Sequence, residues 1–175
     1  MTPVAHIRAK ALIHPQDRII MAKKAILPAK FPVEQRTSSM KPIGLWYAIG
    51  TEWIDWVTTE MPGWMGDKFY RIEITPRVLK LDTARKVHAF TKRYELPKVH
   101  DPERPRSLRY RYSDIDWVRV AKDYAGIEIA PYQHTLRHTY LWYYGWDVAS
   151  GCIWDKSGVK SIRRIRLTSS NLGPV

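Results

Sequence analysis

The feature of this sequence that most limits its fold is a series of short strand-type segments that follow one another closely. Residues 68–75 (KFYRIEIT) alternate apolar and polar side chains, as a strand with one buried face does. Residues 77–83 (RVLKLDT) repeat this pattern directly after Pro76, and residues 44–49 (GLWYAI) form an aromatic and β-branched run. Because a doubly wound sheet alternates each strand with a helix, these adjacent strands favour the α+β class.

Other segments carry helix patterns or further strand patterns. A helix is predicted at 51–61 with Thr51 as its N-cap, and a basic helix at 83–94. A third is predicted at 113–124, capped by Ser113, with an apolar side made of Ile115, Val118 and Ala121. An opening strand is predicted in 3–7 or 9–16, and the apolar residues clustered at 18–27 are followed by Pro28, which ends any helix there. Later strands are predicted at 125–130 and 149–155. Residues 134–146 are predicted to be part helical, and residues 159–167 to form a final strand or short helix.

Length and composition indicate one domain that spans residues 1–175. The chain has 175 residues, of which 45% are hydrophobic, so it can bury a core of ordinary size. Its single cysteine, Cys152, excludes an internal disulfide framework and a cysteine-rich zinc site, and reads as a buried small apolar residue. With no long apolar run and no secretory signal pattern, we expect a soluble protein of the cytoplasm that makes no membrane contact.

A strong positive charge points to anionic partners. The formal net charge is +12 and the pI is near 9.9, which favours nucleic acid or an acidic, nucleic-acid-associated protein. A basic arm rich in proline and arginine, at about 95–112, is the segment expected to contact a polyanion, and its RSLRYRY portion also suits stacking on bases. An alternative is that the arm is simply a solvated surface.

Several well-known site signatures are absent from the sequence. No G-x-G-x-x-G, P-loop, HExxH or GxSxG motif is present. His134 and His138 are spaced to share a helix face, but no third ligand lies near them in the sequence, so surface or capping roles are expected and no metal site is predicted.

Tryptophan is concentrated where a flat ligand could use it. The chain has 8 tryptophans beside only 3 phenylalanines, and three of the indoles fall within residues 40–57. Tryptophan combines a large apolar ring system with a polar N–H, which suits a half-buried cleft. The segment predicts a ligand-binding wall, although strand 44–48 serves equally well as ordinary core.

The order of segments resembles the ADP-ribosyltransferase fold. GLWYA, YRIEI, VLKLD, VAKDY, GIEI and WDVASGCIWD follow one another as the corresponding elements do in the poly-ADP-ribose polymerases, the bacterial ADP-ribosylating toxins and some small phage proteins. The resemblance implies a single α+β domain with a split mixed β-sheet core and flanking helices. It also implies NAD as co-substrate. The small size and high charge of the chain suit a toxin or a phage effector.

The resemblance implies a set of NAD-binding residues. Gly44, Leu45, Trp46 and Tyr47 match the strand that lays an aromatic ring against the nicotinamide, and Trp53 is a further stacking residue. His6 or His14 is implied as the residue on the first strand that holds the ribose. By their positions in the sequence, the candidates for contact with the two phosphates are Arg8, Lys10 and Lys41.

The catalytic acid departs from the family pattern. Ser150 stands where the family has a glutamate before a late strand, and Asp147 is the nearest acid. Asp147 is therefore expected to stabilise the ribosyl cation, although it also suits a turn cap after Gly145. Glu128 is the reserve acid, although strand alternation predicts that it faces solvent.

The resulting expectation is an ADP-ribosyltransferase-like protein that moves ADP-ribose from NAD to a protein or nucleic-acid acceptor and releases nicotinamide. Residues 97–112 and the tail segment KSIRRIR (160–166) would recruit that acceptor. Two alternatives remain: a non-enzymatic nucleic-acid-binding module, and an inhibitor module that has lost catalysis, as Ser150 would suggest.

Overall fold

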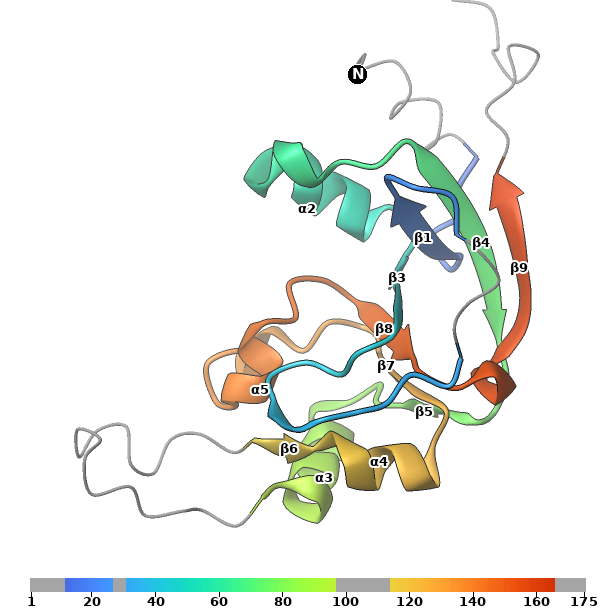
Figure 1. The fold of residues 1–175 in the computed structure, drawn as a ribbon. Coiled ribbons are helices and arrows are strands. Elements are labelled where there is room, and N and C mark those ends of the chain that lie inside the picture. Colours follow the sequence, from blue (N-terminus) through green and yellow to red (C-terminus); the bar gives the residue numbers. More distant parts are fainter. Residues whose placement is uncertain (1–11, 27–30, 97–113, 166–175) are drawn as a thin grey trace, which may run out of the picture.

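A computed structural model describes residues 12–26, 31–96 and 114–165 of the chain. The described part is α+β, as predicted (Figure 1). Its helices are α2 (Glu52–Glu60), α3 (Ala84–Tyr94), α4 (Trp117–Asp123) and α5 (Leu141–Tyr144), with short 3-10 turns η1 (Pro62–Trp64), η2 (His134–Leu136) and η3 (Lys156–Gly158). Its strands are β1 (Arg18–Ala22), β2 (Thr37–Ser39), β3 (Leu45–Ile49), β4 (Lys68–Ile74), β5 (Val78–Lys80), β6 (Ile115–Asp116), β7 (Gly126–Ile129), β8 (Ser150–Ile153) and β9 (Val159–Ile165).

Seven of the strands form one continuous curled sheet in the order β5-β7-β8-β3-β1-β4-β9. Neighbouring strands are antiparallel except for the parallel pair β5–β7, so the sheet is mixed. Strands β2 and β6 form a separate two-stranded pair. Helix α2 lies at one end of the molecule, and α3, α4 and α5 lie at the other (Figure 1). The sheet order differs from the chain order, so residues distant in sequence become neighbours.

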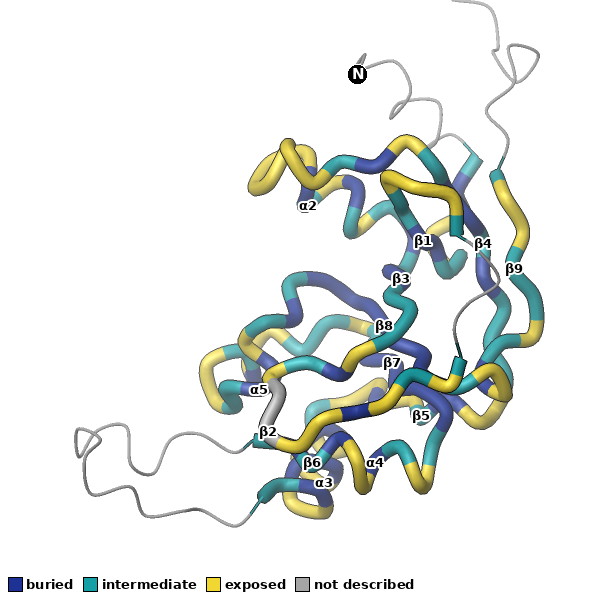
Figure 2. The backbone as a smooth tube through the Cα atoms, in the orientation of Figure 1, coloured by how far each residue is buried: buried dark blue, intermediate teal, exposed yellow. Residues whose placement is uncertain are grey.

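The core is divided between the two faces of the sheet. One face carries a large cluster that holds Trp117, Trp142, Trp146 and Trp154 against α3, α4 and α5. The other face carries Tyr47, Tyr70, Ile20, Ile72 and Ile153. A third, smaller cluster joins α2 to the sheet through Ile54, Ile19 and Phe69. Figure 2 shows the longest buried stretches in the central strands, where every residue of β7 and β8 is buried.

The opening strand lies later in the chain than predicted. Residues 12–17 contain no strand, residues 1–11 lie outside the described part, and β1 covers RIIMA instead. The reason is its position: β1 pairs with both β3 and β4, and Ile19 and Ile20 are buried on opposite faces. A central strand that is buried on both faces shows a continuous apolar run, which resembles a buried helix in sequence.

Helix α4 also begins later than predicted. Ser113 lies outside the described residues, and the carboxylate of Asp116 caps the helix by accepting from the Arg119 backbone N–H at 3.0 Å. Ile115 belongs to β6, which pairs with β2. The helix therefore buries Trp117 and Val120, while Val118, expected on the apolar side, is 38% exposed.

The other predicted elements are confirmed. Strands β3, β4, β5, β7 and β8 and helices α2 and α3 lie within the predicted segments, and the final segment is the strand β9. The basic arm falls almost entirely in residues 97–113, outside the described part. Within the described residues, no helix has the length and apolarity needed to cross a membrane.

Candidate functional site

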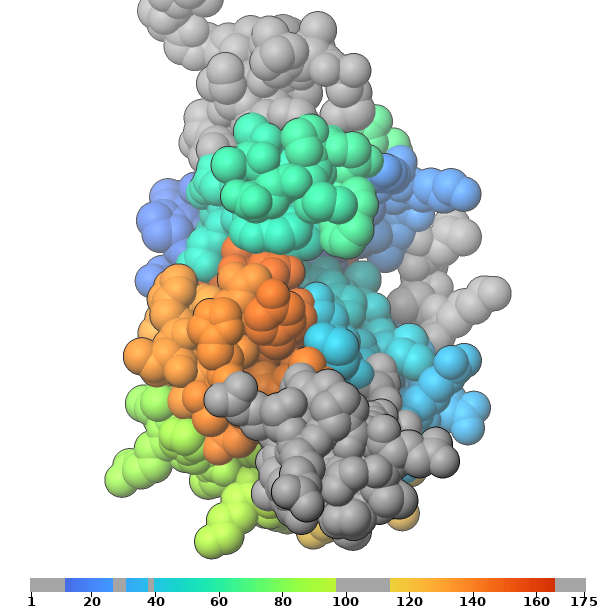
Figure 3. Space-filling view, turned by 90° about the vertical axis from the view of Figure 1, so that its left-hand side faces the viewer, coloured from blue at the N-terminus to red at the C-terminus, as the bar shows by residue number. Residues whose placement is uncertain are grey.

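A cavity of about 250 Å³ opens on one face of the sheet, between α2 and the segment that leads into β8. Figure 3 looks onto this side of the molecule, with the green residues of α2 and η1 above and the orange residues around α5 below. Four tryptophans line the cavity: Trp46, Trp53, Trp64 and Trp146. Its polar lining residues are Lys41, Tyr47, Asp147 and Ser150, and its apolar ones include Ile19, Met21, Ala48 and Val148.

The floor of the cavity is hollow because its central strands carry small side chains. Ala48 of β3 pairs with Ser150 of β8 on one side and with Ile19 of β1 on the other. Trp46 lies two residues before Ala48, on the same face of β3. Its ring contacts that of Trp146 edge to face, with ring centroids 4.9 Å apart. Alternation along a strand thus places a small floor and a large wall on one face.

Helix α2 and the turn η1 supply the opposite wall. Ile54 and Val57 are buried, which fixes the helix on the sheet. Trp53 and Trp56 stack in parallel with ring centroids 4.9 Å apart, and Trp64 of η1 lies 6.4 Å from Trp53. The indoles of Trp53 and Trp64 line the cavity, so this wall is a connected group of aromatic rings.

One carboxylate lines the cavity and is held by an arginine. Asp147 forms an ion pair with Arg137, whose Nη2 lies 3.2 Å from Oδ1, and only 18% of the Asp147 side chain is exposed. The Arg137 guanidinium also lies over the Tyr144 ring, 5.2 Å from its centroid. These contacts fix Asp147 at the cavity wall rather than in bulk solvent.

Lys41 brings a positive charge to the same cavity. Its Nζ lies over the Trp46 ring, 5.3 Å from the centroid, which is a cation–π geometry. Burial lowers the pKa of Lys41, and the nearby Asp147 carboxylate opposes that shift. Gly145 makes room for this side chain, because a Cβ there would meet Lys41 Cε at 2.8 Å.

Ser150 is buried, and its hydroxyl has a partner within the chain. Ser150 Oγ donates to the Val148 carbonyl at 2.9 Å. The preceding backbone N–H, of Ala149, donates to Glu52 Oε2 at 2.7 Å, so α2 is tied to the start of β8. A neutral hydroxyl can accept a hydrogen bond from a sugar but cannot stabilise a cation by charge. The carboxylate of the cavity lining belongs to Asp147.

The structure brings together some of the predicted site residues. Trp46, Trp53, Asp147, Ser150 and Lys41 line one cavity. Tyr47 borders it too, but its ring packs in the cluster on the opposite face of the sheet. Neighbouring residues of one strand point to opposite faces, so Trp46 and Tyr47 cannot both stack on one ligand.

Other predicted residues lie elsewhere. His14 is exposed in the turn before β1, and its backbone N–H donates to Asp17. Gly44 and Leu45 are not among the lining residues; Gly44 allows close packing, because a Cβ there would lie 2.3 Å from the Ile153 carbonyl oxygen. Three predicted contacts, His6, Arg8 and Lys10, lie outside the described residues.

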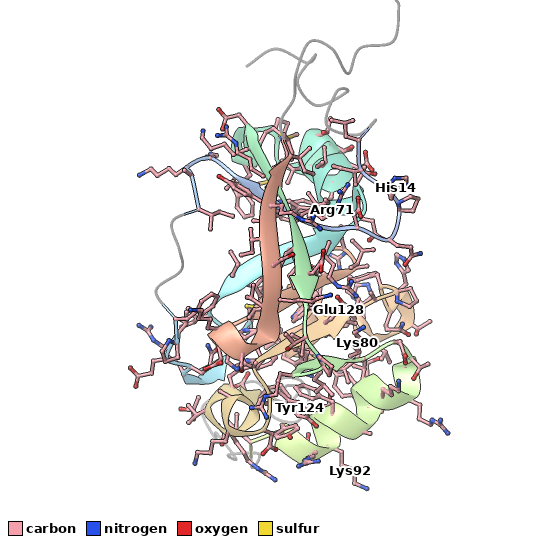
Figure 4. The ribbon with its side chains drawn as sticks, turned by 90° about the vertical axis from the view of Figure 1, so that its right-hand side faces the viewer. His14, Arg71, Lys80, Lys92, Tyr124 and Glu128 are labelled. Atoms are coloured by element: carbon pink, nitrogen blue, oxygen red, sulfur yellow. The ribbon has the colours of Figure 1, made fainter. Side chains whose placement is uncertain are left out.

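The prediction that Glu128 faces solvent is wrong. Glu128 is only 5% exposed, and Figure 4 labels it in the middle of the molecule, seen from the side opposite the cavity. Its carboxylate accepts from Arg18 Nη2 at 2.9 Å and from the Tyr47 hydroxyl at 2.9 Å. The Glu128 carboxylate raises the pKa of Arg18, and burial raises the pKa of Tyr47. This cluster ties β1, β3 and β7 together on the face away from the cavity.

Sequence reasoning missed Trp64, which lines the cavity, and Arg137, which pairs with Asp147. Trp64 follows Pro62-Gly63, and an aromatic residue in a turn is a signal that could have found it. Arg137 had no such signal, because its pairing with Asp147 depends on the turn around α5. His134 and His138 are both exposed, and the described residues contain no group of three or more His, Cys, Asp or Glu placed to hold a metal ion.

Comparisons with known proteins identify no family for the chain. No protein-family model, curated protein or solved structure matches the chain. A function for the chain therefore rests on the chemistry of the cavity itself.

Proposed function

We propose that the cavity binds the nicotinamide and adjoining ribose of NAD, and that the protein transfers ADP-ribose to a macromolecular acceptor with release of nicotinamide. The observation that carries the proposal is the meeting of Trp46, Trp53, Asp147 and Ser150 around one cavity. These residues come from three separate segments, and the sequence predicts Trp46, Asp147 and Ser150 as one site through the resemblance to ADP-ribosyltransferases, with Trp53 as a stacking residue.

The aromatic walls suit the nicotinamide ring. The ring of NAD is flat and positively charged, so it gains both from stacking on indoles and from the attraction between a cation and an aromatic face. Trp46 and Trp53 stand on different walls of the cavity. The volume of about 250 Å³ is slightly below the roughly 300–1,000 Å³ of common ligand pockets. It therefore suits one end of the dinucleotide, with the rest extending outward.

Asp147 supplies the charge that the reaction needs. The bond between ribose C1′ and the nicotinamide nitrogen breaks, its electron pair leaves with neutral nicotinamide, and positive charge develops on the ribose. A carboxylate fixed near that charge in a shielded site stabilises it. The acceptor nucleophile then bonds to C1′ and loses its proton. Arg137 keeps the Asp147 carboxylate in position, and Lys41 offers a cation toward the phosphates.

The test measures NAD binding and label transfer separately. Calorimetry with NAD is expected to show binding to the wild type and to Asp147→Asn alike. Transfer of labelled ADP-ribose to a lysate, with and without nuclease, is expected to fall about 100-fold or more in Asp147→Asn, as when one charge-stabilising group is removed elsewhere. Asp123→Asn is the matched control, because Asp123 also pairs with an arginine but does not line the cavity. Undiminished transfer by Asp147→Asn would refute the role of Asp147, and no NAD binding at millimolar concentration would refute the proposal.

A second candidate is a protein that binds NAD without turning it over. Two observations favour it. The Ser150 hydroxyl is hydrogen-bonded to the Val148 carbonyl, and the positive charge of Arg137 offsets the negative charge of Asp147 in their ion pair. Such an inhibitor-like module would show NAD binding with no release of nicotinamide, and partner binding that survives Asp147→Ala.

A further inference from the structure

The described surface beside the cavity carries an unusually exposed indole. Trp64 is 55% exposed, more than any other large apolar side chain in the described ranges. Leaving an indole in water forgoes favourable burial, so an exposed tryptophan beside a cavity is informative. Trp64 also lines the cavity, so a group that covers its outer part would lie at the cavity mouth.

Trp64 is held as part of a fixed platform. Its ring lies 6.4 Å from Trp53 and 6.5 Å from Trp56, which themselves stack in parallel. The turn that carries Trp64 is packed tightly on the end of β1, because a Cβ at Gly66 would lie 2.6 Å from the Ala22 carbonyl oxygen. The ring therefore presents a face that is already ordered.

A lysine is fixed beside this indole. Lys23 Nζ donates to the carbonyl of Gly63, the residue before Trp64, at 2.6 Å. Lys24, which follows Lys23 in the chain, is exposed. Lys68 Nζ donates to the Lys23 carbonyl, but its charge is paired with Asp67 at 2.8 Å. Lys23, in contrast, forms no ion pair within the described residues, and its ammonium is held at the residue that precedes Trp64.

The acids of α2 lie mostly at its far end. Glu52 accepts from the Ala149 N–H, and Asp55 accepts from the Thr51 hydroxyl. Glu60, at the end nearer η1, is exposed and is the helix acid that opposes an anion there.

From these contacts we infer that Trp64 and Lys23 form a binding site for single-stranded nucleic acid, in which one base stacks on the indole and a backbone phosphate meets the ammonium. An ordered aromatic face joined to a nearby cation is the combination by which proteins hold single strands. The net charge of +12 attracts such a ligand to the molecule. A protein partner would be expected to cover apolar surface without needing the lysine.

Binding of nucleic acid at this surface does not depend on the proposed function. A role of the bound nucleic acid as acceptor does rest on that function, because a nucleic-acid strand stacked on Trp64 would lie at the mouth of the cavity from which ADP-ribose is transferred. The acceptor would then be a nucleotide rather than a protein side chain.

The experiment measures fluorescence anisotropy of a labelled short single-stranded oligonucleotide with the full chain, in the absence of NAD. Trp64→Ala is expected to weaken binding about tenfold, within the range for loss of one stacked base, and Trp64→Phe is expected to keep most of the affinity. Lys23→Gln keeps a donor for the Gly63 carbonyl but removes the charge. It should reduce the slope of log affinity against log salt by about 0.7. Glu60→Lys should strengthen binding.

Lys80→Gln is the matched control, because Lys80 is an exposed lysine on the side of the molecule opposite the cavity (Figure 4). Lys80→Gln should reproduce neither the loss of affinity expected for Trp64→Ala nor the smaller salt dependence expected for Lys23→Gln. Equal affinity of the wild type and Trp64→Ala would overturn the inference, as would preference for a peptide over the oligonucleotide or no binding at all. The affinity of Lys23→Gln for NAD is expected to match that of the wild type. Failure of the nucleic-acid site and failure of the proposed function are therefore distinguished by separate measurements.

Discussion

Gly151 shows how one missing side chain permits a contact across the sheet. It sits in β8 between Tyr47 of β3 and Glu128 of β7, which are its partners on either side. The Tyr47 ring passes over the glycine so that its hydroxyl reaches the Glu128 carboxylate. A Cβ at position 151 would lie 2.4 Å from Tyr47 Cζ and 2.8 Å from the Ile127 carbonyl oxygen.

Gly151→Ala should therefore destabilise the protein. Because the added methyl group meets a buried ring and backbone, we expect a loss of about 1–3 kcal/mol in the free energy of unfolding. Urea unfolding followed by circular dichroism measures this. Gly63→Ala is the control, since a Cβ there meets nothing within 4 Å and the change should stay within about 0.5 kcal/mol. Equal midpoints for the two variants would contradict the packing described for Tyr47.

The sequence predicts where some of these side chains lie, but not where all of them do. The alternation of β3 is visible in the sequence, so the placement of Trp46 and Tyr47 on opposite faces was predictable. The burial of Glu128 was not, because its partner Arg18 lies 110 residues away. A charged residue in a strand looks exposed until its counter-ion is located.

Helix α2 illustrates how an element becomes part of a site. Its start and its length were predictable from Thr51 and the spacing of apolar residues. Its attachment was not, because Glu52 bonds the Ala149 N–H from 97 residues away. This bond joins the helix that carries Trp53 to the start of the strand that carries Ser150, and both residues line the cavity.

Removing this bond should loosen the helix locally. Glu52→Ala is expected to lower the free energy of unfolding by about 1.5–3 kcal/mol, the usual contribution of a hydrogen bond to a charged group. Hydrogen exchange should quicken in the first turn of α2 and at Ala149, and the affinity for NAD should fall. Glu60→Ala, at the other end of the same helix, serves as the control. Unchanged exchange at Ala149 in Glu52→Ala would mean that the bond does not hold the two walls together.

Burial of ionisable groups sets how the whole molecule responds to alkali. Burial raises the pKa of Tyr47 above its ordinary value of 10.0 and that of the Cys152 thiol above 9.0. The folded state keeps these protons at a pH where the unfolded state loses them, so their contribution to stability is complete below about pH 9 and is lost as the pH rises. Lys41 acts in the opposite direction, since burial lowers its pKa from 10.5.

Because the two acidic groups are the more deeply buried, we expect stability to fall between about pH 9 and pH 11. Each group contributes a slope of up to about 1.4 kcal/mol per pH unit once it ionises only in the unfolded state. Urea midpoints measured across this range test the prediction. Tyr47→Phe and Cys152→Ala should each make the decline shallower. A flat profile in the wild type, or an undiminished slope in both variants, would contradict it.

The sequence by itself determined the local periodicities, and with them most helices and strands, the α+β class and the concentration of indoles near Trp46. These properties depend on neighbours within a few residues. Tertiary structure alone decided the sheet order β7-β8-β3-β1. This order gathers Ile19, Trp46, Asp147 and Ser150 around one cavity, and it places Glu128 and the hydroxyl of Tyr47 on the other face. A shift of one residue in register reverses which face a side chain occupies, and register is set by contacts between distant strands.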